Sequence, residues 1–179
     1  MPAVLRVPPP HPACLDEDGL RNECQTRRLR RSGPGGQHRN KVETAIVITH
    51  TPTGVSAEAN ERRSQAANLA VAIQRLRVRL ALQVRTHEPN KPTAGPTLSE
   101  LWQSRTRGQR LAVSGDHADY PALLAEALDW LDGMGWDHRR AADSLGVSAS
   151  QLVKFLRGEP AALDMLNRAR AGRGEGPLR

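Results

Sequence analysis

Aromatic residues are scarce in this sequence: three Trp, one Tyr and one Phe make up 3% of its 179 residues. A hydrophobic core must therefore rest on Leu, Val, Ile and Ala, and the 15 Gly and 13 Pro indicate many turns. No apolar run is long enough to cross a bilayer, so we expect no membrane partner. Residues 1–14 include the run Pro8 to Pro10 where a secretory signal would have an apolar core, and we expect a disordered lead-in there.

Cysteine is also rare, with two residues, Cys14 and Cys24. Their spacing fits no zinc-binding pattern, even with His11 nearby, so we expect neither a metal site nor another cofactor. Two unpaired thiols are typical of a reducing compartment, and the sequence therefore predicts a cytoplasmic protein.

The net charge of +7 is concentrated in one part of the chain. Residues 20–92 hold 14 Lys or Arg against 5 Asp or Glu, whereas residues 93–179 hold 11 of each sign. Such a basic segment indicates a surface that binds nucleic acid. The alternative is a solvated basic face without a partner.

The first half of the chain is predicted to be a small α+β unit over residues 15–86. Strands are expected at 24–31, 43–50 and 55–59, the last two joined by a tight turn that contains Pro52 and Gly54. A long helix should follow, with Asn60 as its N-cap. Its apolar residues recur at steps of four and three and draw one stripe: Leu69, Ile73, Leu76, Leu80 and Val84.

The second half is predicted to be a small all-α module. Residues 87–97 have the composition of a Pro-rich linker, which should hold the two modules apart, so that the first would fold alone. Residues 98–171 form the module and residues 172–179 a loose tail. Within the module we expect a short helix bearing Trp102 and further helices at 121–131, 137–145, 148–157 and 161–171.

Residues 137–157 have the pattern of a helix-turn-helix segment. Ser148 and Gln151 fit a capping box, and Val147 with Leu152 fits a hydrophobic staple. A DNA-binding role is disfavoured because the module has no net charge, and packing or docking is the preferred interpretation. Its candidate contact residues are Trp136, Lys154 and Arg157.

The most informative stretch is RSGPGGQHRNKVE, at residues 31–43. Its glycines allow backbone angles closed to other residues and remove side chains, so the loop could enter a narrow site. Gln37 would present its amide at the tip. From the residues alone the loop is interpreted as a nucleic-acid-binding loop, or else as a surface hairpin with incidental glycines.

The runs GPGGQHRNK, THTPTG and ERRSQAANLAVAIQRLRVRL together resemble the catalytic domain of class I peptide chain release factors, over roughly residues 15–85. The resemblance implies ribosome-dependent hydrolysis of the ester that joins the peptide to the P-site tRNA. It implies that Gly35, Gly36 and Gln37 are the catalytic loop, with the Gln37 N–H stabilising the oxyanion and its side chain positioning water. Contacts to large-subunit ribosomal RNA are assigned to His38, Arg39, Asn40, Lys41, Arg62, Arg63, Arg75 and Arg79.

The chain departs from full release factors because 32 residues precede Gly33, which leaves no room for a codon-reading domain before the loop. We therefore expect a monomer that releases peptides from stalled ribosomes without reading a codon. The alternative is an RNA- or ribosome-binding regulator that has lost hydrolysis, although such a binder has no need of an intact Gly-Gly-Gln tip.

Overall fold

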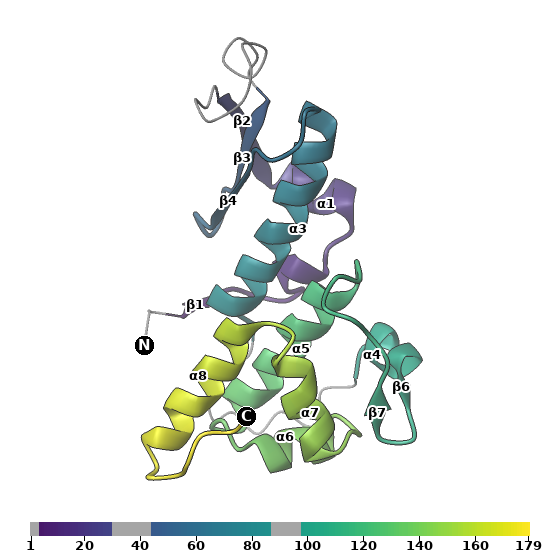
Figure 1. Cartoon of the computed structure of the whole chain (residues 1–179), viewed down its shortest axis with the longest axis vertical. Helices are drawn as coiled ribbons and strands as arrows, with labels where there is room; N and C mark the ends of the chain where they lie inside the picture. Colours follow the sequence, from purple (N-terminus) through teal and green to yellow (C-terminus); the bar gives the residue numbers. More distant parts are fainter. Residues whose placement is uncertain (1–3, 30–43, 87–97) are drawn as a thin grey trace.

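The computed structural model describes residues 4–29, 44–86 and 98–179. It confirms the α+β fold, in which a small antiparallel sheet packs against one long helix and a helical module follows (Figure 1). The sheet lies towards one end of the molecule and the helical module towards the other (Figure 1). Within the described ranges, no helix is long and apolar enough to cross a membrane.

The sheet has the strand order β2-β3-β4, with β2 at Cys24–Leu29, β3 at Ala45–His50 and β4 at Ser56–Ala59. Both pairs are antiparallel, which confirms the predicted hairpin. The turn between β3 and β4 places Gly54 at a φ of 71°, a left-handed conformation that glycine adopts without steric cost. Alternate residues of β3 and β4 are buried, so one face of the sheet belongs to the core.

The long helix α3 spans Gln65–Gln83, a later start than the predicted one. Its N-cap is Ser64, whose hydroxyl accepts a hydrogen bond from the Ala67 N–H, so the assignment of Asn60 was wrong. The predicted stripe is confirmed as the core-facing side. Leu76 and Leu80 are completely buried there, and α3 packs against both β3 and β4.

The prediction of a disordered lead-in over residues 1–14 is wrong for the part that is described. Strand β1, Leu5–Arg6, pairs in parallel with β5, Val84–Arg85, and the short 3-10 helix η1, Pro12–Cys14, packs against α3. Hydrogen bonds of the His11 side chain explain why this N-terminal segment is ordered. Its Nδ1 accepts the Ala13 N–H at 3.0 Å, and its Nε2 lies 3.2 Å from the Val84 carbonyl oxygen. Helix α1, Glu17–Asn22, then leads into β2.

The helical module contains the predicted helices and one element that was not predicted. The addition is a two-stranded hairpin, β6 at Thr106–Arg107 and β7 at Arg110–Leu111. The helices are α4 at Glu100–Arg105, α5 at Tyr120–Gly133, α6 at His138–Ser144, α7 at Ala149–Leu156 and α8 at Pro160–Ala171.

The helix-turn-helix pattern corresponds to α6 and α7, but half of the capping box is absent. The Ser148 hydroxyl accepts the Gln151 N–H at 3.2 Å, as predicted. The Ser148 N–H, however, donates to the Gln109 carbonyl in the β6–β7 turn rather than to the Gln151 side chain. Trp136, a candidate contact residue, is 9% exposed and forms part of the core, so it is unavailable for docking.

The two halves of the chain do not stand apart, and the prediction that the linker separates them is wrong. Helix α5 packs along α3, and one continuous hydrophobic core includes residues of both helices. The Thr86 N–H donates to the buried Asp129 carboxylate at 3.2 Å. The buried Arg85 guanidinium donates to the Ala81 carbonyl at 2.7 Å and lies 6.0 Å from the centre of the Trp136 ring. Burying these apolar surfaces outweighs the spacing effect of a Pro-rich linker.

The tail at 172–179 was predicted to be loose, but it folds back on α8. The Asn167 side chain donates to the Leu178 carbonyl at 3.0 Å and accepts the Leu178 N–H at 2.8 Å. Arg170 and Arg173 both form ion pairs with Glu175. Paired polar contacts therefore fix a segment that has few apolar residues.

Candidate catalytic and RNA-binding site

The predicted catalytic loop, Gly35, Gly36 and Gln37, lies outside the described residues, as do His38, Arg39, Asn40 and Lys41. The structure describes the two points at which the chain enters and leaves this segment. Leu29 at the end of β2 is paired with Ala45 at the start of β3. Both ends of the segment therefore start from the same end of the sheet, next to the first turns of α3 (Figure 1).

Asn68 holds one end of this segment in place. Its side-chain nitrogen donates to the carbonyl oxygens of Thr44, at 2.6 Å, and Arg62, at 3.0 Å. Its side-chain oxygen accepts the Arg62 N–H at 2.9 Å. Asn68 is fully buried, so these bonds are shielded from water. This role of Asn68 was not predicted from the sequence, although an Asn inside an apolar helical stripe is a signal that could have indicated it.

Arg62 and Arg63 lie in the turn before α3 and are exposed, at the same end of the molecule as the loop ends. The backbone of Arg62 is fixed by Asn68, which leaves its side chain facing solvent. This arrangement brings two predicted RNA-binding residues close to the base of the predicted catalytic loop. Their contact with RNA stays a prediction.

Arg75 and Arg79 are further along α3 and have intramolecular partners. Arg75 donates to the Glu58 carbonyl at 2.8 Å and pairs through both terminal nitrogens with the Glu61 carboxylate, at 2.5 and 3.2 Å. Arg79 donates to the Ser56 carbonyl at 2.5 Å. These bonds connect α3 to β4 and the turn after it, so both arginines have a structural role. A contact with ribosomal RNA stays a prediction for them and would have to use their remaining donors.

The two cysteines and the histidine near the sheet are not poised to act as a nucleophile or a base. Burial raises the pKa of the Cys14 thiol and of the Cys24 thiol to about 11 in each case, so both stay protonated at neutral pH. His50 is buried between Glu23 Oε2, at 2.8 Å, and Thr53 Oγ1, at 2.7 Å, so both ring nitrogens are occupied. In the ranges that the structure covers, no group of three His, Cys, Asp or Glu could hold a metal ion.

Comparison with known proteins identifies the family. Residues 20–115 match the model of the RF-1 domain, and the chain belongs to this family. It is 47% identical over 76 residues to peptide chain release factor 1 of Acidiphilium cryptum, covering 41% of this chain and 22% of that protein. It is 40% identical over 94 residues to peptide chain release factor 1 of Verminephrobacter eiseniae, covering 51% of this chain and 25% of that protein. Peptide chain release factor 2 of an Acidovorax species is 48% identical to it over 59 residues, covering 33% of this chain and 16% of that protein.

The aligned part of the chain thus spans about a quarter or less of these relatives. The family match includes the Gly-Gly-Gln segment, the sheet and α3, and it continues through α4 and the β6–β7 hairpin. The helices from α5 onwards lie beyond it. The resemblance expected from the sequence is therefore confirmed for the first half of the chain.

Proposed function

We propose that the chain is a ribosome-dependent peptidyl-tRNA hydrolase of the release-factor type. The observation that carries this proposal is the RF-1 domain match over residues 20–115, which contains Gly35, Gly36 and Gln37 intact. The clamp that Asn68 forms on Thr44 supports it, because a catalytic loop needs ends fixed by a rigid element.

In this proposal the loop enters the peptidyl-transferase centre of the large subunit. The Gln37 N–H stabilises the oxyanion that develops when water attacks the ester carbonyl, and one such donor contributes roughly 3–4 kcal/mol. The Gln37 side chain positions the water. Attack breaks the bond between the ester carbonyl carbon and the tRNA oxygen, and a proton passes to that oxygen, so no acyl-enzyme forms.

A finer proposal is that release needs no stop codon and serves stalled ribosomes in the cytoplasm, with the protein acting as a monomer. Arg62 and Arg63, exposed beside the loop ends, would contact ribosomal RNA phosphates together with the basic loop residues. Because these contacts displace counterions, the affinity for ribosomes should fall steeply as salt is raised.

The test measures peptide release from ribosomes stalled with and without a stop codon in the decoding site. Gly36→Val should abolish release while ribosome binding persists. The added side chain would exclude backbone angles open to glycine and would keep the loop from approaching the ester closely. Gly133→Val is the matched control, since a Cβ at Gly133 meets nothing within 4 Å. Release by Gly36→Val at the native rate would refute the catalytic assignment, and ribosome binding without release by the native chain would favour the regulator.

A further inference from the structure

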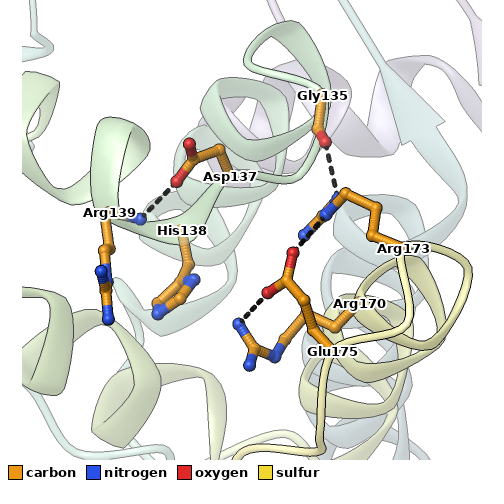
Figure 2. A pocket seen from close by; sticks show the side chains of 7 residues that line it. All are labelled: Gly135, Asp137, His138, Arg139, Arg170, Arg173 and Glu175. Atoms are coloured by element: carbon orange, nitrogen blue, oxygen red, sulfur yellow. Dashed lines mark hydrogen bonds and ion pairs between the residues drawn. The ribbon is translucent and has the colours of Figure 1, made fainter.

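A polar hollow of about 450 Å³ lies in the helical module, at the end of the molecule opposite the β2–β3–β4 sheet (Figure 1). It is lined by the first turn of α6, the end of α8 and the tail (Figure 2). Three arginines face it, Arg139, Arg170 and Arg173, together with His138. This cluster contrasts with the zero net charge of residues 93–179 as a whole.

The hollow already holds one anionic group from the chain itself. Arg170 Nη1 lies 2.7 Å from one oxygen of the Glu175 carboxylate, and Arg173 Nε lies 2.7 Å from the other. Figure 2 shows this carboxylate between the two guanidinium groups. Two arginines that share one carboxylate have the geometry that also suits a phosphate group, whose oxygens accept paired N–H bonds.

The two arginines are held in position by backbone contacts. Arg173 donates to the carbonyl oxygens of Gly135, at 3.1 Å, and Trp136, at 3.2 Å. Gly135 and Trp136 both have positive φ, of 62° and 63°, so these two acceptors belong to one tight turn after α5. The Arg170 Nε donates to the Gly176 carbonyl at 2.9 Å. The donors are therefore oriented before any ligand arrives, which lowers the cost of binding.

The opposite wall supplies donors that Glu175 does not use. Arg139 is exposed, and among the residues that the structure describes none of the ion pairs involves its guanidinium. Asp137 is engaged elsewhere, since its Oδ1 accepts the backbone N–H groups of Arg139 and Arg140 at 3.0 and 3.2 Å rather than the Arg139 guanidinium. His138 lies between Arg139 and the Arg170–Glu175 pair (Figure 2). Burial and the nearby arginines lower the pKa of His138, so its ring is neutral at pH 7.

We propose that this hollow binds a phosphate group of RNA, and that the Glu175 carboxylate occupies the site until a phosphate displaces it. The choice of RNA as the source of the phosphate rests on the proposed ribosomal function. With Glu175 displaced, three arginines face the hollow and Asp137 is the one carboxylate left among its lining residues. A phosphodiester therefore gains charge-assisted bonds from both walls. The helical module would then contact RNA through one local site rather than through its bulk charge.

The experiment follows the His138 ring proton in NMR spectra of the full chain, assigned by comparison with His138→Gln, without ribosomes. One arm adds inorganic phosphate and the other a short oligouridylate. The native chain should show a saturable shift in both arms. Arg139→Gln should weaken binding roughly tenfold, the effect of one lost charge-assisted bond. Arg140→Gln is the matched control, because it makes the same charge change on the neighbouring exposed residue, which does not line the hollow.

Glu175→Gln should bind phosphate several-fold more tightly, since the competing carboxylate is removed. The tail should remain attached in this variant through Asn167 and Leu178. The proposal is overturned if Arg139→Gln and Arg140→Gln weaken binding equally, if Glu175→Gln leaves the affinity unchanged, or if phosphate shifts His138 but the oligonucleotide does not. Because neither arm involves peptide release, failure here is distinguishable from failure of the proposed hydrolase function.

Discussion

The side-chain nitrogen of Asn68 donates a hydrogen bond of 2.6 Å to the carbonyl oxygen of Thr44. Thr44 is the described residue that directly follows the predicted catalytic segment, and Asn68 lies in the first turns of α3. Through this bond the helix that packs on the sheet also fixes where the segment ends. One buried amide, in addition to the pairing of β2 with β3, thus fixes the point at which the predicted catalytic segment ends.

We expect Asn68→Ala to lower the free energy of unfolding by about 2–3 kcal/mol, because buried groups of Thr44 and Arg62 lose their partner. Peptide release should slow more than ribosome binding weakens. Urea unfolding and single-turnover release measure the two effects. Gln83→Ala, an exposed position on the same helix, is the control. Native stability in the Asn68 variant would mean that the clamp is dispensable.

The contact between Thr86 and Asp129 should stabilise the junction of the two halves. Asp129 is 4% exposed and accepts hydrogen bonds from both the N–H and the hydroxyl of Thr86. Asp129→Ala leaves these donors unpaired and should cost about 1–3 kcal/mol. Thr86→Val removes the hydroxyl but keeps the N–H, so it should cost less. Chemical denaturation ranks the two variants, and an equal or reversed order would contradict this account.

Stability should fall as the pH is lowered below about 6.5. Burial lowers the pKa of His11 from its ordinary value of 6.5, although the nearby Asp129 carboxylate opposes the shift, and burial lowers the pKa of His138 as well. The unfolded chain therefore binds these protons more tightly, so stability is complete above pH 6.5 and is lost as the pH falls towards the folded pKa values. Protonation of His11 at Nδ1 also removes its bond from the Ala13 N–H.

Unfolding in urea at about pH 7.5 and pH 5.5 measures this loss, a range chosen around the ordinary His pKa. The difference between the two conditions should shrink in His11→Gln and shrink further when His138→Gln is added. A double variant that loses as much stability as the native chain would show that other groups cause the pH dependence.

A fragment of residues 1–96 should not fold as an independent domain. Helix α5 packs on α3, and the completely buried Leu76 and Leu80 belong to a core that α5 shares. Removal of α5 would expose this apolar surface to water. We expect the fragment to lack a cooperative thermal transition by circular dichroism. In the full chain, Leu128→Ala should cost about 2–5 kcal/mol. A fragment with a sharp transition and dispersed NMR signals would contradict this prediction.

Local sequence patterns predicted the helices and strands well where a clear hydrophobic repeat or turn signal is present. The stripe through Leu76 and Leu80 predicted the buried face of α3, and Pro52 with Gly54 predicted the turn of the hairpin. The same rules placed the N-cap at Asn60 rather than Ser64, because both residue types cap helices and nothing local distinguishes them.

Contacts between distant residues could not be predicted from the sequence. His11 lies 73 positions from the Val84 carbonyl that it contacts, and Asp129 lies 43 positions from Thr86. Such partners order the N-terminal segment and join the two halves. The composition of residues 1–14 and 87–97 had instead predicted a disordered lead-in and a separating linker. For the candidate site, the Gly-Gly-Gln motif was evident from the sequence, but Asn68 gains its role through Thr44, which is 24 positions away.

Helix α3 sets a fixed separation between Thr44, where the predicted catalytic segment ends, and the junction with the helical module at Val84. Its 19 residues rise about 28 Å, with Asn68 near the first residue and Val84 directly after the last. Residues inserted at 87–97 should leave this spacing unchanged, since the packing of α5 on α3 maintains it. One helical turn inserted into α3 would lengthen it by about 5 Å. A binding partner that contacts both ends of α3 must therefore offer two contact sites whose spacing matches the length of this helix.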